Sequence, residues 1–196
     1  MPRDGRRGQA MVEFSLITPV IFFVVFGIFE FGMLTFDLAS SRFATSEAAK
    51  VVAQVGSLSP SCSIVKGCPA RFGAALLPPN DGCDADCQML IAVNNTALGS
   101  TSLEQVDEID LWKLKSDGTF AKLSPAVVQK YKMNSLTPLG GSNYPASGRN
   151  TQLGTADFVQ VDIVWTYNPL TGLFKNIVGA PQLTTSYIVR LEPQRY

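Results

Sequence analysis

Apolar residues are concentrated in one segment near the start of the chain. No residue from Phe14 to Phe29 is charged, and after Glu30 the apolar character continues to Phe36. The 23 residues from Phe14 to Phe36 would form a helix of about 34 Å, which is enough to cross the ~30 Å hydrocarbon core of a bilayer. We therefore predict a transmembrane segment within residues 9–36.

The helical pattern continues beyond this apolar segment. Small and apolar residues recur on one helix face, at Ala44, Ala48, Val52 and Val55. Gly56, followed closely by serine and proline, ends the pattern. The sequence thus predicts one helix over 9–55, whose extension beyond the membrane, in residues 37–56, packs on a separate domain.

Residues 106–196 contain short runs in which apolar and polar positions alternate. The clearest run is 157–167, where one face carries Val159, Val161, Ile163, Trp165 and Tyr167. Runs over 106–114 and 183–192 also predict strands, and 87–98 predicts a short helix. The expected fold class is α+β, with a small antiparallel sheet packed against the long helix.

The composition of the chain argues against several classes of function. Lys and Arg together number 16, as do Asp and Glu, and this balance argues against a nucleic-acid partner. The chain has no histidine, which excludes Ser-His-Asp and Cys-His catalysis and every His-ligated metal site. Phosphate-loop, dinucleotide-binding and nucleophile-elbow motifs are missing as well. We expect neither an enzyme nor a bound cofactor or metal.

The charges that flank the apolar segment predict its orientation. Arg3, Arg6 and Arg7 precede it, opposed only by Asp4. The positive-inside rule therefore places the N-terminus in the cytoplasm and the following domain outside the cell membrane. A cleavable secretory signal is the alternative, but its apolar part is shorter and ends in an A-x-A-like site, which this segment lacks.

Four cysteines lie in a region over 57–105 that is rich in turn-forming residues. They are Cys62, Cys68, Cys83 and Cys87, and the first pair is too widely spaced for a zinc knuckle. An even number of cysteines outside the cytoplasm predicts two disulfides. We slightly favour Cys62–Cys87 with Cys68–Cys83 over the local pairs Cys62–Cys68 and Cys83–Cys87.

Glu13 lies at the start of the predicted membrane segment, where a charge usually needs a partner. If the chain were cut after Gly8, the new α-amino group would belong to Gln9, four residues before Glu13 and on the same helix face. That amine would pair with Glu13 of its own chain or of a neighbouring subunit. Alternatively, Glu13 extends to the lipid headgroups, and the residues alone leave both readings open.

The stretch GQAMVEFSLITPVIFFVVFGIFEFG resembles the N-terminus of TadE-like proteins, which are minor pilins or pseudopilins of tight-adherence (Flp-type) pilus systems. The segments SRFATSEAAKVVAQ and YIVRLEP are similar to that family as well. The resemblance implies that 1–8 is a basic leader ending at Gly8, with Gln9 the first, Glu13 the fifth and Phe14 the sixth mature residue. It does not extend to the cysteine-bearing region.

This resemblance also implies a pilin-like structural role in pilus assembly or secretion. A prepilin peptidase would cut the chain. Other pilin-like subunits would contact its N-terminal helix, and the helix would lie in membrane lipid at an inner-membrane assembly platform. The alternative is an extracytoplasmic binding module whose signal anchor is not cleaved.

Overall fold

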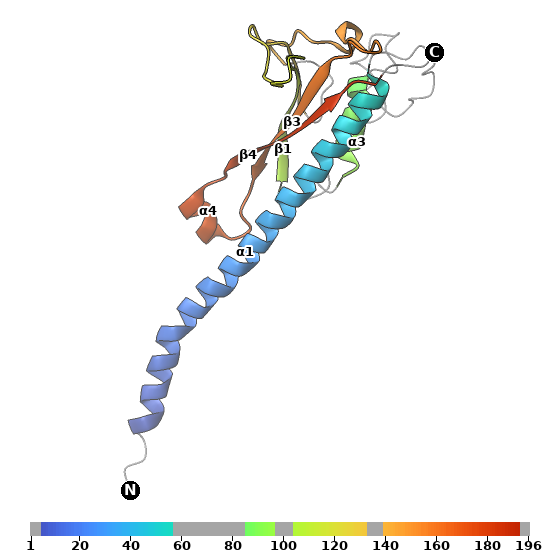
Figure 1. Ribbon diagram of the computed structural model, residues 1–196. Coiled ribbons are helices and arrows are strands. Elements are labelled where there is room, and N and C mark those ends of the chain that lie inside the picture. The colour runs from blue at the N-terminus through green and yellow to red at the C-terminus, as the bar shows by residue number, and fades with distance from the viewer. Residues whose placement is uncertain (1–4, 57–84, 97–103, 133–138, 193–196) are drawn as a thin grey trace, which may run out of the picture.

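The computed structural model describes residues 5–56, 85–96, 104–132 and 139–192. A long helix projects from a small domain built on a four-stranded antiparallel sheet (Figure 1). The predicted α+β class is confirmed. Residues 1–4 of the predicted leader and three of the four cysteines, Cys62, Cys68 and Cys83, lie outside the described residues.

Helix α1 runs from Gly5 to Val55. Its 51 residues make it about 75 Å long. It begins four residues before the predicted start at Gln9 and ends at the predicted residue. Gly56 adopts a positive φ of 53°, and its N–H donates to the Val52 carbonyl at 2.8 Å. This left-handed cap is a conformation that glycine adopts without steric cost.

The sheet has the strand order β2-β1-β3-β4 with every pair antiparallel. Its strands are β1 (Glu104–Lys113), β2 (Val128–Tyr131), β3 (Phe158–Tyr167) and β4 (Gln182–Arg190). Strands predicted at 106–114, 157–167 and 183–192 are confirmed. The sequence gives no clear signal for β2, which has four residues and lies at the edge of the sheet.

One face of the sheet is covered by the second half of α1 and by α3 (Ala85–Asn94). Here α1 contributes small side chains, so its backbone can approach the strands closely; they are Ala44, Ala48, Ala49 and Val52. All five residues predicted on one face of β3 are at most 3% exposed. The alternation in the sequence therefore located the core of the domain.

Polar contacts fasten α1 to the sheet along its length. Near the helix end, the Glu192 N–H donates to the Ala53 carbonyl at 2.9 Å. Farther back, the hydroxyls of Thr45 and Thr185 are 2.8 Å apart and buried. The connection between β3 and β4, residues 168–181, contains the unpredicted helix α4 (Gly172–Val178). This connection reaches down α1 toward its apolar half (Figure 1).

Candidate functional site

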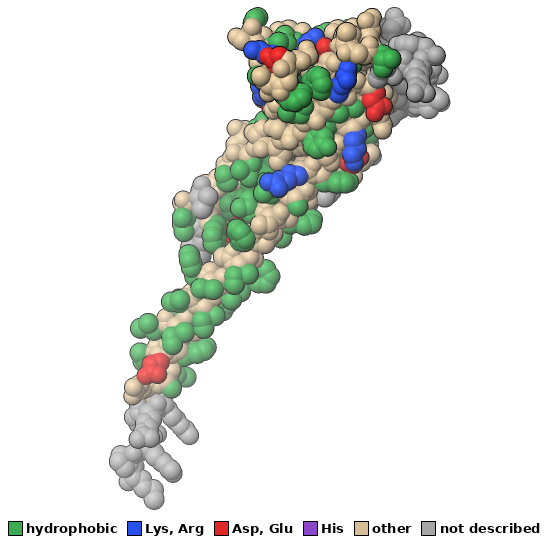
Figure 2. Space-filling model, viewed as in Figure 1, with side chains coloured by type: hydrophobic (Ala, Val, Ile, Leu, Met, Phe, Trp, Pro, Cys, Tyr) green, Lys and Arg blue, Asp and Glu red, His purple; other side chains and the backbone are tan. Residues whose placement is uncertain are grey.

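The first half of α1 exposes large apolar side chains on all sides. From Met11 to Phe29 these side chains are between 41% and 77% exposed. Hydrophobic side chains cover the lower part of the helix, whereas most of the charged side chains in view lie in the upper part of the molecule (Figure 2). Within the described residues, α1 is the one helix long and apolar enough to cross a membrane.

The uncharged surface of α1 is longer than its apolar sequence suggests. Between Glu13 and Arg42 the acidic residues are Glu30 and Asp37, which are only 6% and 1% exposed. The helix therefore presents no exposed charge over about 42 Å. An exposed surface of this kind fits lipid or other apolar helices, and water only poorly.

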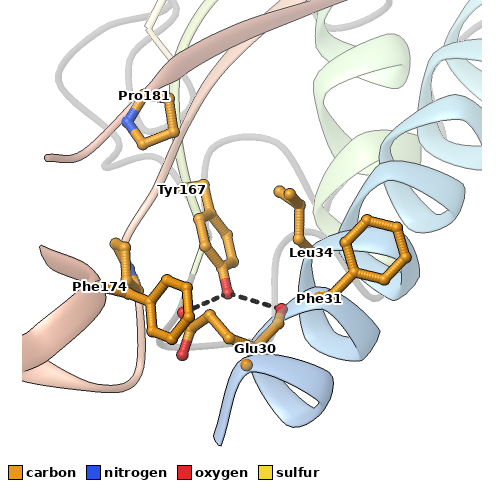
Figure 3. A pocket seen from close by; sticks show the side chains of 8 residues that line it. Glu30, Phe31, Leu34, Tyr167, Phe174 and Pro181 are labelled. Carbon is orange, nitrogen blue, oxygen red and sulfur yellow. Dashed lines mark hydrogen bonds between the residues drawn. The ribbon is translucent and has the colours of Figure 1, made fainter. Parts of the chain in front are cut away.

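Glu30 is held by the β3–β4 connection (Figure 3). Its Oε1 accepts hydrogen bonds from the Tyr167 hydroxyl at 2.7 Å and from the Leu170 N–H at 2.9 Å. Its Oε2 accepts two more from Thr171, one from the N–H and one from the hydroxyl, both at 3.3 Å. These donors satisfy the carboxylate, so a charged residue in the apolar helix is shielded by its own chain.

This arrangement also affects Tyr167. Burial raises the pKa of the Tyr167 hydroxyl above its ordinary value, and its hydrogen bond to Glu30 acts in the same direction. Tyr167 therefore stays protonated and remains a donor to Glu30 at physiological pH.

Helix α4 lies against α1 below Glu30. The ring of Phe174 stacks on that of Phe23, with 6.2 Å between centroids and an interplanar angle of 15°. A Cβ added at Gly27 would lie 3.6 Å from the Phe174 ring. Between α1 and the connection is a cavity of about 330 Å³ lined by Gly27, Glu30, Phe31, Leu34, Tyr167, Pro169, Phe174 and Pro181. Apart from the Glu30 carboxylate and the Tyr167 hydroxyl, the side chains that line it are apolar (Figure 3).

Another face of α1 carries phenylalanines spaced seven residues apart. These four side chains, which we call the Phe stripe, are all more than half exposed: Phe22, Phe29, Phe36 and Phe43. Neighbouring helix positions differ by 100°, so the stripe is turned about 100° from the line of Glu30 and Asp37. None of these side chains belongs to the buried core or to the hydrophobic residues packed against it, and a seven-residue repeat is the spacing by which one helix packs along another.

The predicted processing residues lie together in the exposed first turns of α1. Gln9 and Glu13 share a helix face, as the spacing predicts, and the Gln9 side-chain amide donates to the Glu13 carboxylate at 3.1 Å. A Cβ added at Gly8 meets no atom within 4 Å. Packing in the fold therefore does not require glycine at this position. Phe14 is 70% exposed, and cleavage after Gly8 stays a prediction.

Among the four cysteines the structure describes Cys87. It lies in α3, is 1% exposed and is disulfide-bonded. Its partner lies outside the described residues, so both predicted pairing schemes stay predictions.

The acidic cluster of β1 is engaged within the sheet. The Lys130 ammonium contacts Glu108 at 2.7 Å and Asp110 at 3.2 Å, while Asp107 accepts a hydrogen bond from Thr166. These contacts assign the cluster a role in holding β1 to its neighbouring strands.

Comparison with protein families adds one finding to this geometry. Residues 8–50 match the family of TadE-like proteins. The match begins at Gly8 and ends within α1, so the resemblance seen in the N-terminal sequence is confirmed for this helix. The TadE-like segment comprises the exposed apolar half, Glu30, the Phe stripe and most of the surface that packs on the sheet. Comparison with curated proteins and with solved structures gives no match.

The intramolecular role of Glu30 was not foreseen from the sequence. Glu30 is the one charged residue between Phe14 and Phe36, and nothing in that stretch indicates a partner for it. Instead, its donors come from residues 137 to 141 positions later in the chain. A pattern read along one helix carries no information about such distant partners.

Proposed function

We propose that this protein is a structural, non-catalytic component of a tight-adherence pilus apparatus, a minor pilin or pseudopilin. The observation that carries the proposal is the coincidence of two features in α1. The family match covers residues 8–50, and the same stretch presents an apolar surface without exposed charge from Phe14 to Ser41. Such a helix can lie in a membrane before assembly and can pack against similar helices afterwards.

In this proposal a prepilin peptidase cuts the chain after Gly8 at the cytoplasmic face of the membrane. Glycine costs about 1 kcal/mol relative to alanine in a helix, which helps the scissile backbone unwind. The cut gives Gln9 a positive α-amino group one helical turn from Glu13. The two opposite charges then compensate each other in a poorly solvated environment, within one subunit or between two.

The sheet domain then lies outside the cell membrane, where the cysteines form two disulfides. Other pilin-like subunits contact α1, and the Phe stripe is the surface best suited to them because it is turned away from the sheet. Membrane lipid and the inner-membrane assembly platform are the remaining partners. The proposal includes no cofactor and no nucleic acid.

A complementation experiment tests this proposal. In a strain that lacks the protein, the wild-type chain should restore surface pili, whereas Glu13→Gln should reach the membrane in normal amounts and fail to restore them. Glu47→Gln is the matched control, because Glu47 is a partly exposed carboxylate of the same helix that forms an ion pair with Lys50 and lies outside the apolar half. Normal piliation in a strain without the protein would overturn the proposed function.

The same strains separate two readings of Glu13. If Glu13→Gln assembles pili normally, the charge-pairing account is wrong and Glu13 only extends to the headgroups. If deletion leaves pili intact and the mature chain keeps its leader, an uncleaved, signal-anchored binding module is the better description.

A further inference from the structure

We propose that the β3–β4 connection, residues 168–181, is itself a membrane-inserted element whose partner is the acyl-chain region of the outer leaflet. The protein would thus contact lipid with two segments that lie far apart in the sequence. This inference rests on the proposed membrane insertion of α1.

The first argument is the depth of α4 along α1. A hydrocarbon core of ~30 Å covers about 20 helical residues. Wherever that length is placed between the exposed polar residues Gln9 and Arg42, it includes residues 22–29. Phe23 and Gly27 are therefore at hydrocarbon depth in every placement, and Phe174 lies against both. Tilting the helix lengthens the stretch inside the membrane and strengthens this conclusion.

The second argument is the surface that the connection presents. Leu170 and Ile177 are 63% and 68% exposed, although both are large and apolar. Phe174 of the same connection stacks on Phe23, which belongs to the exposed apolar surface of α1. Exposure of these apolar side chains is unfavourable in water but favourable among lipid acyl chains. No other protein surface is then needed to bury them.

The third argument is that the connection satisfies its polar groups where it meets the helix. The N–H groups of Leu170 and Thr171 donate to Glu30, as does the Tyr167 hydroxyl. Backbone donors and a carboxylate that would each be costly in hydrocarbon therefore satisfy one another.

Lys175 limits how deep α4 lies. Its side chain is exposed and belongs to the last turn of α4, and a lysine at this level extends its ammonium group toward the headgroups. Helix α4 therefore enters the outer leaflet with its apolar residues and keeps one charged side chain at the headgroup level, as interfacial helices do.

Photolabelling tests the inference. The full chain is reconstituted in nanodiscs of phosphatidylcholine and phosphatidylglycerol that carry a diazirine on the acyl chain, and labelled residues are mapped by mass spectrometry. Residues 14–29 should be labelled, and so should the segment from Leu170 to Ile177.

Leu153 is the matched control. It is 86% exposed and borders the same surface depression as Glu192, whose N–H bonds to the far end of α1. Labelling near Ile177 should exceed that at Leu153 about tenfold, because only Ile177 is at membrane depth.

A pair of variants sharpens this result. Ile177→Asp should lower lipid labelling of the connection several-fold while leaving the domain folded, because Ile177 is exposed. Leu153→Asp should change nothing. If 14–29 is labelled and 170–177 is not, the inserted connection is wrong while the membrane helix stands. If neither segment is labelled, the membrane part of the proposed function fails as well.

Discussion

At the scale of single residues, Glu30 determines how the β3–β4 connection is held. Replacing it with alanine removes the acceptor of the Leu170 and Thr171 N–H groups, and hydrogen bonds to a charged group are each worth about 1.5–3 kcal/mol. We expect amide hydrogen exchange at these two residues to accelerate roughly 10- to 100-fold in Glu30→Ala, as measured in detergent solution. Tyr167→Phe removes a different donor and should affect those amides less. Unchanged exchange in Glu30→Ala would contradict the assigned role.

Asp110 makes the stability of the domain depend on pH. Burial raises its pKa to about 6, and Glu108 adds to this rise while Lys130 opposes it; Asp162 faces it from the paired strand. The folded state thus holds a proton that the unfolded chain releases between about pH 4 and 6. The free energy of unfolding should therefore fall as the pH rises through that window, by roughly 1–3 kcal/mol, and level off above it.

Urea unfolding at pH 4 and pH 6.5 measures this slope. Asp110→Asn should remove it. Asp117→Asn should keep it, because hydrogen bonds from Thr119 hold the pKa of Asp117 below its usual range and it titrates outside this window. An equal slope in wild type and Asp110→Asn would show that Asp110 is not its source.

At the scale of elements, the small residues of α1 set its distance from the sheet. Ala48 is fully buried, so Ala48→Leu forces extra volume between helix and strands and should lower the free energy of unfolding by about 1–3 kcal/mol. Lys50→Leu on the exposed side should change it by less than about 0.5 kcal/mol. Equal stability of Ala48→Leu and wild type would contradict the close packing described for α1.

Substitutions in the Phe stripe should affect pilus assembly and leave the stability of the domain unchanged. Phe36→Ala and Phe43→Ala remove exposed side chains that do not belong to the core. Both variants should unfold like the wild type and yet reduce piliation in the complemented strain, because the helix loses contact area for its neighbours. If piliation and stability both fall, the substitutions act by destabilising the domain, and the assigned role of the Phe stripe in contacts between subunits is wrong.

How well the sequence predicted each element depended on where that element's partners lie. The apolar run and the alternation of β3 are local patterns, so the helix, three strands and the face carrying Trp165 were predictable. Strand β2 is too short to show a period. Helix α4 and the contacts of Glu30 arise from packing between segments far apart in the chain, which no window of sequence displays. The processing motif predicted around Gly8 is a short linear pattern, and it stays a prediction.

At the scale of the whole molecule, the chain divides along the length of α1 into two parts. The upper half of the helix packs against the sheet as part of a folded domain. Hydrogen bonds such as that between the hydroxyls of Thr45 and Thr185 connect it to β4. The lower half is apolar and exposed, and the connection at Glu30 joins the two parts. This division matches the proposed role, because a subunit that moves from the membrane into an assembly needs one surface that changes neighbours and one domain that stays folded.

The N-terminal residue of the mature chain tests this account most directly. Intact-mass and N-terminal peptide analysis of protein from cells that contain a prepilin peptidase should give a chain that begins at Gln9. The variant Gly8→Val should stay at full length and still insert, since a side chain at Gly8 disturbs no contact in the fold and the apolar span is unchanged. A wild-type chain that keeps Met1 or Pro2 in those cells would contradict the account.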